Sequence, residues 1–555
     1  MNLPKESCRI PAEDAGNPGE REDDEMKIRQ QSENFVVPDP KGNLGRTPVI
    51  RQRGGGKGVP VREEGQQLML FSATAENLRT TRSTEGGKAG DLSPVQPQKV
   101  PKAETMRTEA VPAGMEDVVE RLETAFQKVA ANKGAPGPDR QTVEQVRLYL
   151  PNLLNALRLS LLDGSYIPGD IRRVWIPKSG GGARGLGIPN VVDRVVQEAI
   201  RSVLEPLYEP TFHPSSHGFR PGRGCQTAIA EARGYVEQGC PWVVDLDLEK
   251  FFDRVPHQRL MARLAQRVED RRLLALISRM LKARVVLPDG VKVSTEEGVP
   301  QGGPLSPLLS NIVLSELDEE LARRKHRFVR YADDCNIYVR SERAGKRVMA
   351  SVVSFLEGRM GLKVNAAKSA VARPETRHFL GYRLKPETDK RPEILLSERS
   401  VKRLNERIRE LTPRNRGWTL KGVIGEINGY LSGWFGHFRV CTPGISYVIH
   451  KVDAHIRRRL RALILKQWKS KLTIARRLIE RGGKPKTVWR RVYEGRKSIW
   501  NLSHDPVVDR ALSNASFATL GLETLKGKFE ALWEPSPVLP KKGEQLSLFG
   551  GYLRS

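Results

Sequence analysis

The sequence has few cysteines, no long apolar run and no cluster of metal-ligating histidines. Its five cysteines are odd in number and form no Cys-x-x-Cys pair, which argues against structural zinc and disulfides. No apolar run approaches the roughly 18 residues that a membrane-spanning helix needs, and the acidic, polar start of the chain does not resemble a signal peptide. His450 and His455 lie off the i, i+4 spacing of paired metal ligands. We therefore expect a reduced, cytoplasmic protein without a membrane partner.

The chain instead has a large excess of positive charge. Lys and Arg number 93 against 65 Asp and Glu, which gives a net charge of +28 and indicates a polyanionic partner, most simply a nucleic acid. Between residues 445 and 500 there are 17 Lys or Arg against three acids, so this segment alone carries +14. Charge runs are usually solvated helix faces, but this one is interleaved with Trp468, Trp489, Tyr493 and Trp500. Basic and aromatic side chains together favour RNA or DNA binding.

Tyr331-Ala332-Asp333-Asp334 lies between two short apolar runs that predict a β-hairpin. Adjacent carboxylates at a hairpin tip repel each other unless a cation lies between them, and carboxylate oxygens suit Mg²⁺. The structural alternative is a solvated acidic turn. Residues 241–248 predict a buried strand that ends in Asp247, a third carboxylate for a two-metal site. Asp245 and Asp253 flank that strand end, where they would cap it or face solvent.

Two glycine-containing segments suggest contacts with a nucleotide. Residues 172–178 and 185–189 predict two strands around a Gly-rich tip, flanked by Lys178 and Arg184, which suit a triphosphate; the alternative is a basic surface hairpin. The glycines of the loop at 297–307 allow close approach of backbone to a ligand, and Gln301 supplies an amide there. Beyond Leu395 three apolar stripes at helical spacing predict a helical bundle.

Both tails are polar, and residues 1 to about 110 are expected to be disordered. Each tail holds one apolar pentapeptide, Gln67-Leu68-Met69-Leu70-Phe71 and Gln545-Leu546-Ser547-Leu548-Phe549. Both resemble the pentapeptide that binds the bacterial sliding clamp. Chance is the competing explanation for so short a match, so Gln545, Leu546, Leu548 and Phe549 are candidate clamp-binding residues.

The motifs together resemble those of bacterial group II intron-encoded reverse transcriptase/maturases. The matching elements follow the family's order over about residues 115–530: Arg184 to Pro189, Gly218 to Arg223, Asp247 to Asp253, Pro300 to Pro307, Tyr331 to Asp334, Phe379 to Tyr382, and Gly429 to Phe438. The resemblance implies an α+β, right-hand polymerase with fingers and a palm built on an antiparallel sheet, followed by an α-helical thumb/maturase domain. It implies a tail at 1–112, fingers and palm at 113–394, thumb/maturase at 395–475, a basic DNA-binding extension at 476–530 and a tail at 531–555.

The resemblance also implies roles for individual residues. Asp247, Asp333 and Asp334 would be catalytic and would hold two Mg²⁺ ions with the Leu248 carbonyl. Lys178, Arg184 and Gln301 would contact the incoming dNTP, Phe252 would exclude a 2′-OH, and Lys368 is a weaker candidate for protonating pyrophosphate. Intron RNA would be bound by basic residues of the thumb, for which we select Arg457, Arg458, Arg459, Arg461, Lys466 and Lys469.

Two features depart from the family's usual pattern. Gly185 stands where the family usually has Pro, which we expect to loosen the hairpin slightly. No Cys follows Cys441, so we expect a form without the C-terminal HNH endonuclease domain, whose mobility would use a DNA primer from elsewhere, such as a replication fork.

The function expected is RNA-directed DNA synthesis on intron RNA, with help to splicing and mobility at a DNA target, in the bacterial cytoplasm near the nucleoid. Two alternatives stay open: a domesticated relative in defence or DNA repair, and a catalytically silent RNA-binding splicing factor.

Overall fold

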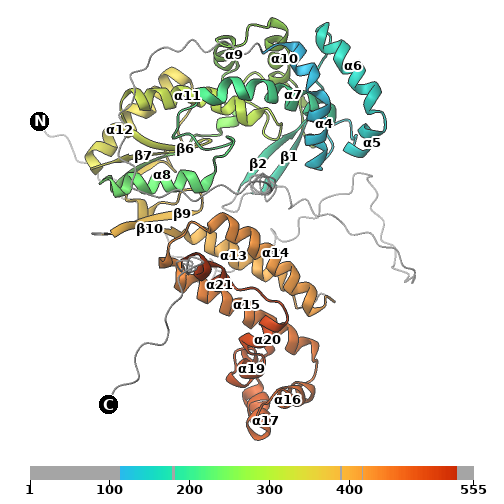
Figure 1. The fold of residues 1–555 in the computed structure, drawn as a ribbon, viewed down its shortest axis with the longest axis vertical. Coiled ribbons are helices and arrows are strands. Elements are labelled where there is room, and N and C mark those ends of the chain that lie inside the picture. Colours follow the sequence, from blue (N-terminus) through green and yellow to red (C-terminus); the bar gives the residue numbers. More distant parts are fainter. Residues whose placement is uncertain (1–112, 178–181, 388–389, 415–416, 534–555) are drawn as a thin grey trace, which may run out of the picture. The chain divides into compact units, whose positions relative to one another are not determined.

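The computed structural model of the protein describes residues 113–177, 182–387, 390–414 and 417–533 (Figure 1). Every described residue belongs to one compact unit of the chain. The N-terminal tail and both apolar pentapeptides lie outside the described residues, so the expectations about them stay untested. The four cysteines of the described part, Cys225, Cys240, Cys335 and Cys441, are all free and buried.

The first described part combines helices with a small sheet. Apolar residues recur at helical spacing in its first helices. Four of them, Val118, Leu122, Phe126 and Val129, are buried in the core. Its sheet has the order β2-β1-β4-β5, with β1 and β2 antiparallel from Arg172↔Ile188 to Pro177↔Ala183. The elements are α3 (Met115–Glu120), α4 (Leu122–Ala131), α5 (Val143–Leu148), α6 (Leu150–Leu162), β1 (Ile171–Pro177), β2 (Ala183–Ile188), α7 (Val191–Tyr208), β4 (Val285–Val286) and β5 (Lys292–Val293).

A second, antiparallel sheet has the order β6-β7-β3-β8 and is hereafter the central sheet. The expected hairpin is confirmed, because β6 pairs with β7 down to Tyr331↔Asp334. Apolar residues that point from this sheet, such as Phe328 and Ile337, join the core formed with the surrounding helices. The elements are β3 (Trp242–Leu246), β6 (Arg327–Tyr331), β7 (Asp334–Val339), β8 (Ala370–Ala372), α8 (Cys225–Glu237), α9 (His257–Ala265), α10 (Arg271–Leu281), α11 (Ser306–Arg323) and α12 (Glu342–Phe355).

The strands that follow α12 differ from those that the apolar runs at 361–365 and 379–382 predict. Residues 361–365 form only an isolated bridge, Leu248↔Val364. Leu362 and Val364 of this irregular segment nevertheless pack in the core. The edge strand is instead β8, which pairs with β3. Residues 379–381 make a tight turn, and β9 (Tyr382–Glu387) begins only after it and pairs with β10 (Lys390–Leu396).

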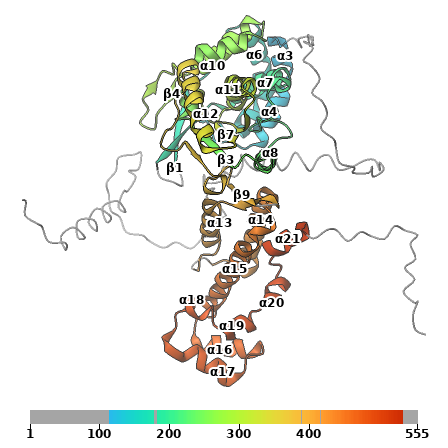
Figure 2. The ribbon, with the colours of Figure 1, turned by 90° about the vertical axis from the view of Figure 1, so that its left-hand side faces the viewer.

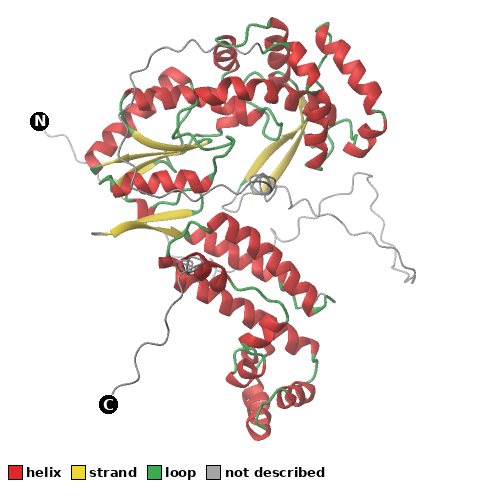
Figure 3. Ribbon diagram, viewed as in Figure 1, coloured by secondary structure: helices red, strands yellow, loops and turns green. Residues whose placement is uncertain are grey.

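All elements of the described chain after β10 are helical (Figures 2 and 3). The three predicted stripes lie on α13 (Glu398–Leu411), α14 (Leu420–Phe438) and α15 (Ser446–Gln467), which contact one another through buried residues such as Leu404, Leu431 and Leu460. Shorter helices follow: α16 (Lys471–Glu480), α17 (Pro485–Tyr493), α18 (Ile499–Leu502), α19 (Pro506–Ala511), α20 (Asn514–Thr519) and α21 (Leu525–Trp533). None of the helices in the described ranges has the length and apolar character to cross a bilayer.

Candidate active site

The hairpin β6–β7 turns on two residues, Ala332 and Asp333, because Tyr331 is paired with Asp334. Ala332 has φ +56°, a left-handed conformation that costs a residue with a Cβ about 1 kcal/mol. Such strain persists only where surrounding contacts enforce it. The Asp333 side chain is half-buried and Asp334 is exposed, so both carboxylates lie at the end of the central sheet.

Strand pairing brings the third carboxylate to the same place. Leu246 is opposite Cys335, so the next step of this antiparallel register sets Asp247 opposite Asp334. The Asp247 backbone is fixed by two hydrogen bonds, from its own N–H to Ser369 Oγ (3.0 Å) and from the Asn365 N–H to its carbonyl (2.8 Å). Its Oδ2 atom is buried without a hydrogen-bond partner and forms an ion pair with Lys368 Nζ at 3.2 Å.

The three carboxylates act on one another electrostatically. Burial, together with the negative charges of Asp333, Asp247 and Asp245, raises the pKa of Asp334 to about 7. Burial also raises the pKa of Asp333, which the Arg184 guanidinium partly offsets. Asp334 nevertheless keeps surface open to solvent. Repelling carboxylates that stay accessible are a natural binding place for a cation.

The donor set fits a magnesium ion. The three carboxylates supply the hard oxygen ligands that Mg²⁺ prefers, and two of them together with substrate phosphates suffice to hold the ion. One oxygen of Asp247 is buried and accepts no hydrogen bond. No three His, Cys, Asp or Glu side chains in the described ranges already surround one point at metal distance. The carboxylates must therefore reorient slightly on binding.

The two flanking aspartates behave differently from Asp247. Asp245 is half-buried and accepts a hydrogen bond from Arg377 Nε at 2.7 Å. Burial raises the pKa of Asp245, and the Arg377 partner lowers it. Asp253 is exposed, 3.7 Å from Arg173 Nη1. Asp253 therefore faces solvent, as the structural alternative predicts, whereas Asp245 lies within β3 and is held by Arg377 instead of capping the strand or facing solvent.

The candidate nucleotide contacts are partly described. Lys178 lies outside the described residues, whereas Arg184 is exposed on β2 and close enough to act on the charge of Asp333. The loop of Gln301 is joined to β2 by a hydrogen bond from the Gly187 N–H to the Gln301 carbonyl (2.7 Å). A Cβ on Gly302 would lie 2.6 Å from the Gly187 carbonyl oxygen, so glycine is needed for this contact.

Phe252 is half-buried and lies in a 3₁₀ turn, Phe251–Asp253, directly after the Asp247 segment. Its carbonyl accepts a hydrogen bond from the Val299 N–H at 2.6 Å. Gly298 has φ +93°, and a Cβ there would lie 2.8 Å from the Phe252 carbonyl oxygen. The glycine loop at 297–307 thus holds the backbone of Phe252 as well as β2.

The expected loosening at Gly185 does not fit the structure. Arg173 fills the space beside this glycine, since a Cβ there would lie 2.6 Å from Arg173 Nη1. The same nitrogen donates a hydrogen bond to the Gly185 carbonyl (3.1 Å), and the guanidinium lies 5.5 Å from the centre of the Trp175 ring. This cross-strand arginine reinforces the hairpin where a proline would have stiffened it.

Six basic residues in and just after α15 are selected for RNA binding, and three of them contact other parts of the protein. Arg461 is 5% exposed, donates to the Leu512 carbonyl (3.0 Å) and pairs with Asp509, so its expected RNA contact is corrected to a structural role. Arg459 ties α15 to the end of α13 by donating to the Thr412 carbonyl at 3.0 Å. Arg458 stacks on Trp500, 4.1 Å from the ring centre.

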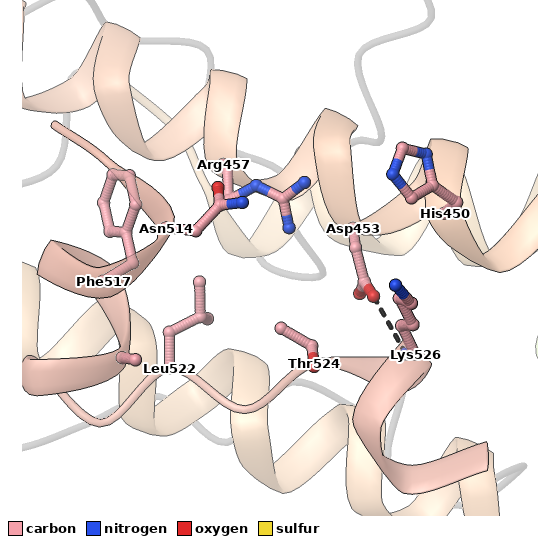
Figure 4. Close-up of a pocket in the computed structure, with 9 residues that line it drawn as sticks. His450, Asp453, Arg457, Asn514, Phe517, Leu522, Thr524 and Lys526 are labelled. Atoms are coloured by element: carbon pink, nitrogen blue, oxygen red, sulfur yellow. Dashed lines mark hydrogen bonds between the residues drawn. The ribbon is translucent and has the colours of Figure 1, made fainter. Parts of the chain in front are cut away.

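The other three remain available to a ligand. Lys466 is exposed in the last turn of α15, and Lys469 is exposed just beyond the end of that helix. Arg457 lines a cavity of about 240 Å³ between α15, α20 and α21, with Lys526 and His450 on its rim and Phe517 in its wall (Figure 4). Asp453, also in this lining, is occupied by the N–H groups of Leu525 (3.1 Å) and Lys526 (2.9 Å).

Sequence reasoning did not single out Arg330, which is fully buried directly beneath the Ala332 turn. The available signal was a charged residue inside an apolar strand, next to the acidic turn. A lone cation in such a run does not reveal its partners, because they come from distant parts of the chain.

Comparison with known families agrees with this geometry. Residues 176–384 match the family described as reverse transcriptase (RNA-dependent DNA polymerase). Residues 401–481 match the group II intron, maturase-specific domain. The first match contains the central sheet with its three aspartates, and the second contains α13 to α15.

Three curated proteins illustrate the relationship. Protein YkfC of Escherichia coli is 35% identical over 48% of this chain and 80% of that protein. A COX1/OXI3 intron 2 protein of Saccharomyces cerevisiae is 28% identical over 63% of this chain and 47% of its own length. The group II intron-encoded protein LtrA of Lactococcus lactis is 38% identical over 37% of this chain and 34% of its own length. The alignments thus span less than half of the latter two. The chain belongs to the family of group II intron reverse transcriptase/maturases, with the α+β polymerase fold that this family implies.

Proposed function

We propose that the protein is an RNA-directed DNA polymerase that copies intron RNA into DNA and binds that RNA to assist splicing and mobility. The observation that carries the proposal is the convergence of Asp247, Asp333 and Asp334 at one end of the central sheet, where one buried oxygen of Asp247 accepts no hydrogen bond and is paired with the exposed ammonium of Lys368. The two family matches support both halves of the activity.

In this proposal the three aspartates and the Leu248 carbonyl hold two Mg²⁺ ions. When bound, such ions activate the primer 3′-OH and neutralise charge on the departing pyrophosphate. Oδ2 of Asp247 would be one of the ligands, and the Lys368 ammonium now lies 3.2 Å from that oxygen. Displaced from Asp247, Lys368 would be positioned to donate a proton to the leaving group.

The remaining contacts position the nucleotide. Arg184, with Lys178 from the same hairpin, binds the triphosphate and brings positive charge toward Asp333. Phe252 meets the sugar and excludes a 2′-OH, and Gln301 lies against the new base pair. Because Gly187 and Phe252 are both hydrogen-bonded to the loop at 297–307, a shift of that loop moves the triphosphate site and the sugar site together.

RNA is held by the basic face of the helical part. Lys466 and Lys469 contact phosphates, and the cavity beside Arg457 receives an exposed group of the RNA chain. The basic segment beyond residue 476 contacts the DNA target. Net positive charge supports this assignment, because counterion release from a polyanion supplies most of the affinity of such surfaces.

The finer partner proposed is the bacterial sliding clamp, through the pentapeptides that end in Phe71 and Phe549, with the protein located at the nucleoid. The test is capture by purified clamp. Leu548→Ala/Phe549→Ala combined with Leu70→Ala/Phe71→Ala should abolish capture, and retention by this fourfold variant would refute the proposal.

Separate measurement of the two activities tests the main proposal. Asp333→Ala should abolish cDNA synthesis and leave protein-assisted splicing of the intron nearly intact, since the RNA-binding face is elsewhere in the chain. Loss of both activities in a variant with unchanged thermal unfolding would contradict two separate surfaces.

A further inference from the structure

Arg330 is a charged residue of β6 with 0% exposure, and its partner Asp318 on α11 is 1% exposed. The guanidinium binds the carboxylate through two hydrogen bonds, Nε to Oδ1 at 2.7 Å and Nη2 to Oδ2 at 2.6 Å. Burying such a pair is not an efficient way to stabilise a fold, because desolvation offsets most of the attraction. A buried ion pair therefore suggests a need for defined geometry.

The other donors of Arg330 reach the acidic turn and its supports. Nη2 donates to Ser216 Oγ at 2.7 Å, and Nη1 donates to Asn311 Oδ1 and to the Ala332 carbonyl, both at 3.0 Å. All five N–H groups of the guanidinium are thus used. The Ala332 carbonyl belongs to the left-handed residue of the turn, immediately before Asp333.

The glycine of the Gly218–Arg223 motif closes the same network from the other side. Asn311 Nδ2 donates to the Gly218 carbonyl at 2.8 Å. A Cβ on Gly218 would lie 2.4 Å from the Ala332 backbone nitrogen and 3.0 Å from the Tyr331 carbonyl carbon. Only a glycine lets these two backbones approach so closely.

The segment that bears Gly218 is itself fixed. The Arg330 N–H donates to the Ser215 carbonyl and the His217 N–H to the Arg330 carbonyl, both at 2.9 Å. The His217 ring is held between Glu231 Oε2 (2.7 Å) and Thr227 Oγ1 (2.9 Å) of α8. The turn is thus held between a strand, a helix-anchored loop and a buried cation.

We propose that Arg330 and Gly218 are positioning residues that impose the left-handed Ala332 turn and so aim the carboxylates of Asp333 and Asp334. The inference rests on the proposed function, because those carboxylates are the proposed metal ligands. It assigns the Gly218–Arg223 motif a role as the rear support of the active site. Arg330 itself touches no reacting atom, and its effect passes through the Ala332 carbonyl.

The test uses the full-length protein with Gly218→Ala, Arg330→Lys and the control Gly224→Ala. Gly224 directly follows the Gly218–Arg223 motif, and a Cβ there meets nothing within 4 Å. Lysine keeps the charge beside Asp318 but lacks the planar fork. Three quantities are measured: kcat and KM for dNTP in primer extension, binding of Mn²⁺ alone by electron paramagnetic resonance, and amide hydrogen exchange of residues 331–334.

Gly218→Ala and Arg330→Lys should each lower kcat at least tenfold with KM within twofold of the parent, and weaken Mn²⁺ binding at least threefold. Exchange should accelerate in residues 331–334 and not in β3, while Gly224→Ala matches the parent. Gly218→Ala indistinguishable from Gly224→Ala would overturn the inference, as would exchange that accelerates throughout the central sheet. If the parent itself makes no cDNA, the proposed function fails, and Mn²⁺ binding and exchange still decide the positioning role.

Discussion

The Nζ atom of Lys368 lies 3.2 Å from Oδ2 of Asp247, an oxygen that is buried and has no hydrogen-bond partner. The ammonium thus stands where a cation of the reaction would bind. Its side chain is otherwise largely exposed, which lets it leave and return without rearranging the core. The pair suggests that Lys368 protects Asp247 in the resting protein and becomes a proton donor when displaced.

Replacing Lys368 should separate these two effects. Lys368→Gln should lower kcat for primer extension by about a hundredfold or more, because a general acid of this kind contributes on that order. The Mg²⁺ concentration for half-maximal rate should fall, since no ammonium competes for Asp247. Lys363→Gln is the matched control, because Lys363 is also exposed in this segment but pairs with Glu249. Equal effects of the two substitutions would contradict the assignment.

Phe252 should determine the choice of sugar. Phe252→Ala should lower the preference for dNTP over rNTP by about tenfold to a hundredfold, because removing a ring that blocks the 2′-OH removes a steric penalty of that size. The ratio of kcat/KM for the two nucleotides measures it. Phe251→Leu is the control: Phe251 is buried at 2% exposure, so this change should cost about 1 kcal/mol of stability and leave the preference unaltered. A preference unchanged in Phe252→Ala would exclude the gate.

We expect the basic residues in and just after α15 to be of two kinds, exposed lysines that bind RNA and a buried arginine that stabilises the fold. Lys466→Gln with Lys469→Gln should weaken RNA binding and reduce the slope of log affinity against log salt by about one per lysine, because each is exposed and free to meet a phosphate. Lys346→Gln, which changes an exposed lysine of α12, serves as the control for the loss of one positive charge elsewhere on the surface. Arg461→Met should instead lower the free energy of unfolding by about 1 to 2 kcal/mol, since the Leu512 carbonyl loses its buried donor while the exposed Asp509 is solvated. RNA affinity unaffected by the lysine pair would exclude that face.

Ionisation of Asp334 should lower the free energy of unfolding of the metal-free protein at high pH. Its pKa is about 7 in the folded chain against an ordinary 3.8, so the folded state binds more protons than the unfolded state between these values. Stability therefore falls as pH rises from 4 to 7. Asp334→Asn should raise the unfolding free energy at pH 8 by about 1 kcal/mol after solvent screening of this exposed group. Excess Mg²⁺ should cancel the difference, and a destabilised variant without Mg²⁺ would contradict it.

Local pattern predicted much of the fold because several elements depend on neighbouring residues. Alternation of aromatic and β-branched residues around Asp333 marks the β6–β7 hairpin, and helical spacing marks α13 to α15. The segment at 361–365 shows the limit. Its apolar residues suit a strand, yet β3 pairs with Ala370–Ala372 instead, and only the tertiary fold decides between the two.

The site divides in the same way. The identities of the three aspartates follow from motif and strand order. Whether a given Arg or Lys is buried and paired or exposed depends on partners far along the chain. Arg461 is indistinguishable from Lys466 in sequence but meets Leu512 and Asp509, about 50 residues away. Arg330 meets Ser216, 114 residues away. Contacts of this range are set by packing, which no local pattern encodes.

Primer extension on an RNA template with Mg²⁺ and dNTPs tests the central claim most directly, comparing the parent with Asp247→Asn and Asp245→Asn. These aspartates are two residues apart at the end of one strand. Asp245 accepts a hydrogen bond from Arg377, whereas Oδ2 of Asp247 accepts no hydrogen bond and is paired with the exposed ammonium of Lys368. The account predicts cDNA from the parent, a loss of about a thousandfold or more in Asp247→Asn, and activity within tenfold of the parent in Asp245→Asn. No extension by the folded, RNA-binding parent, or equal activity of the two variants, would contradict it.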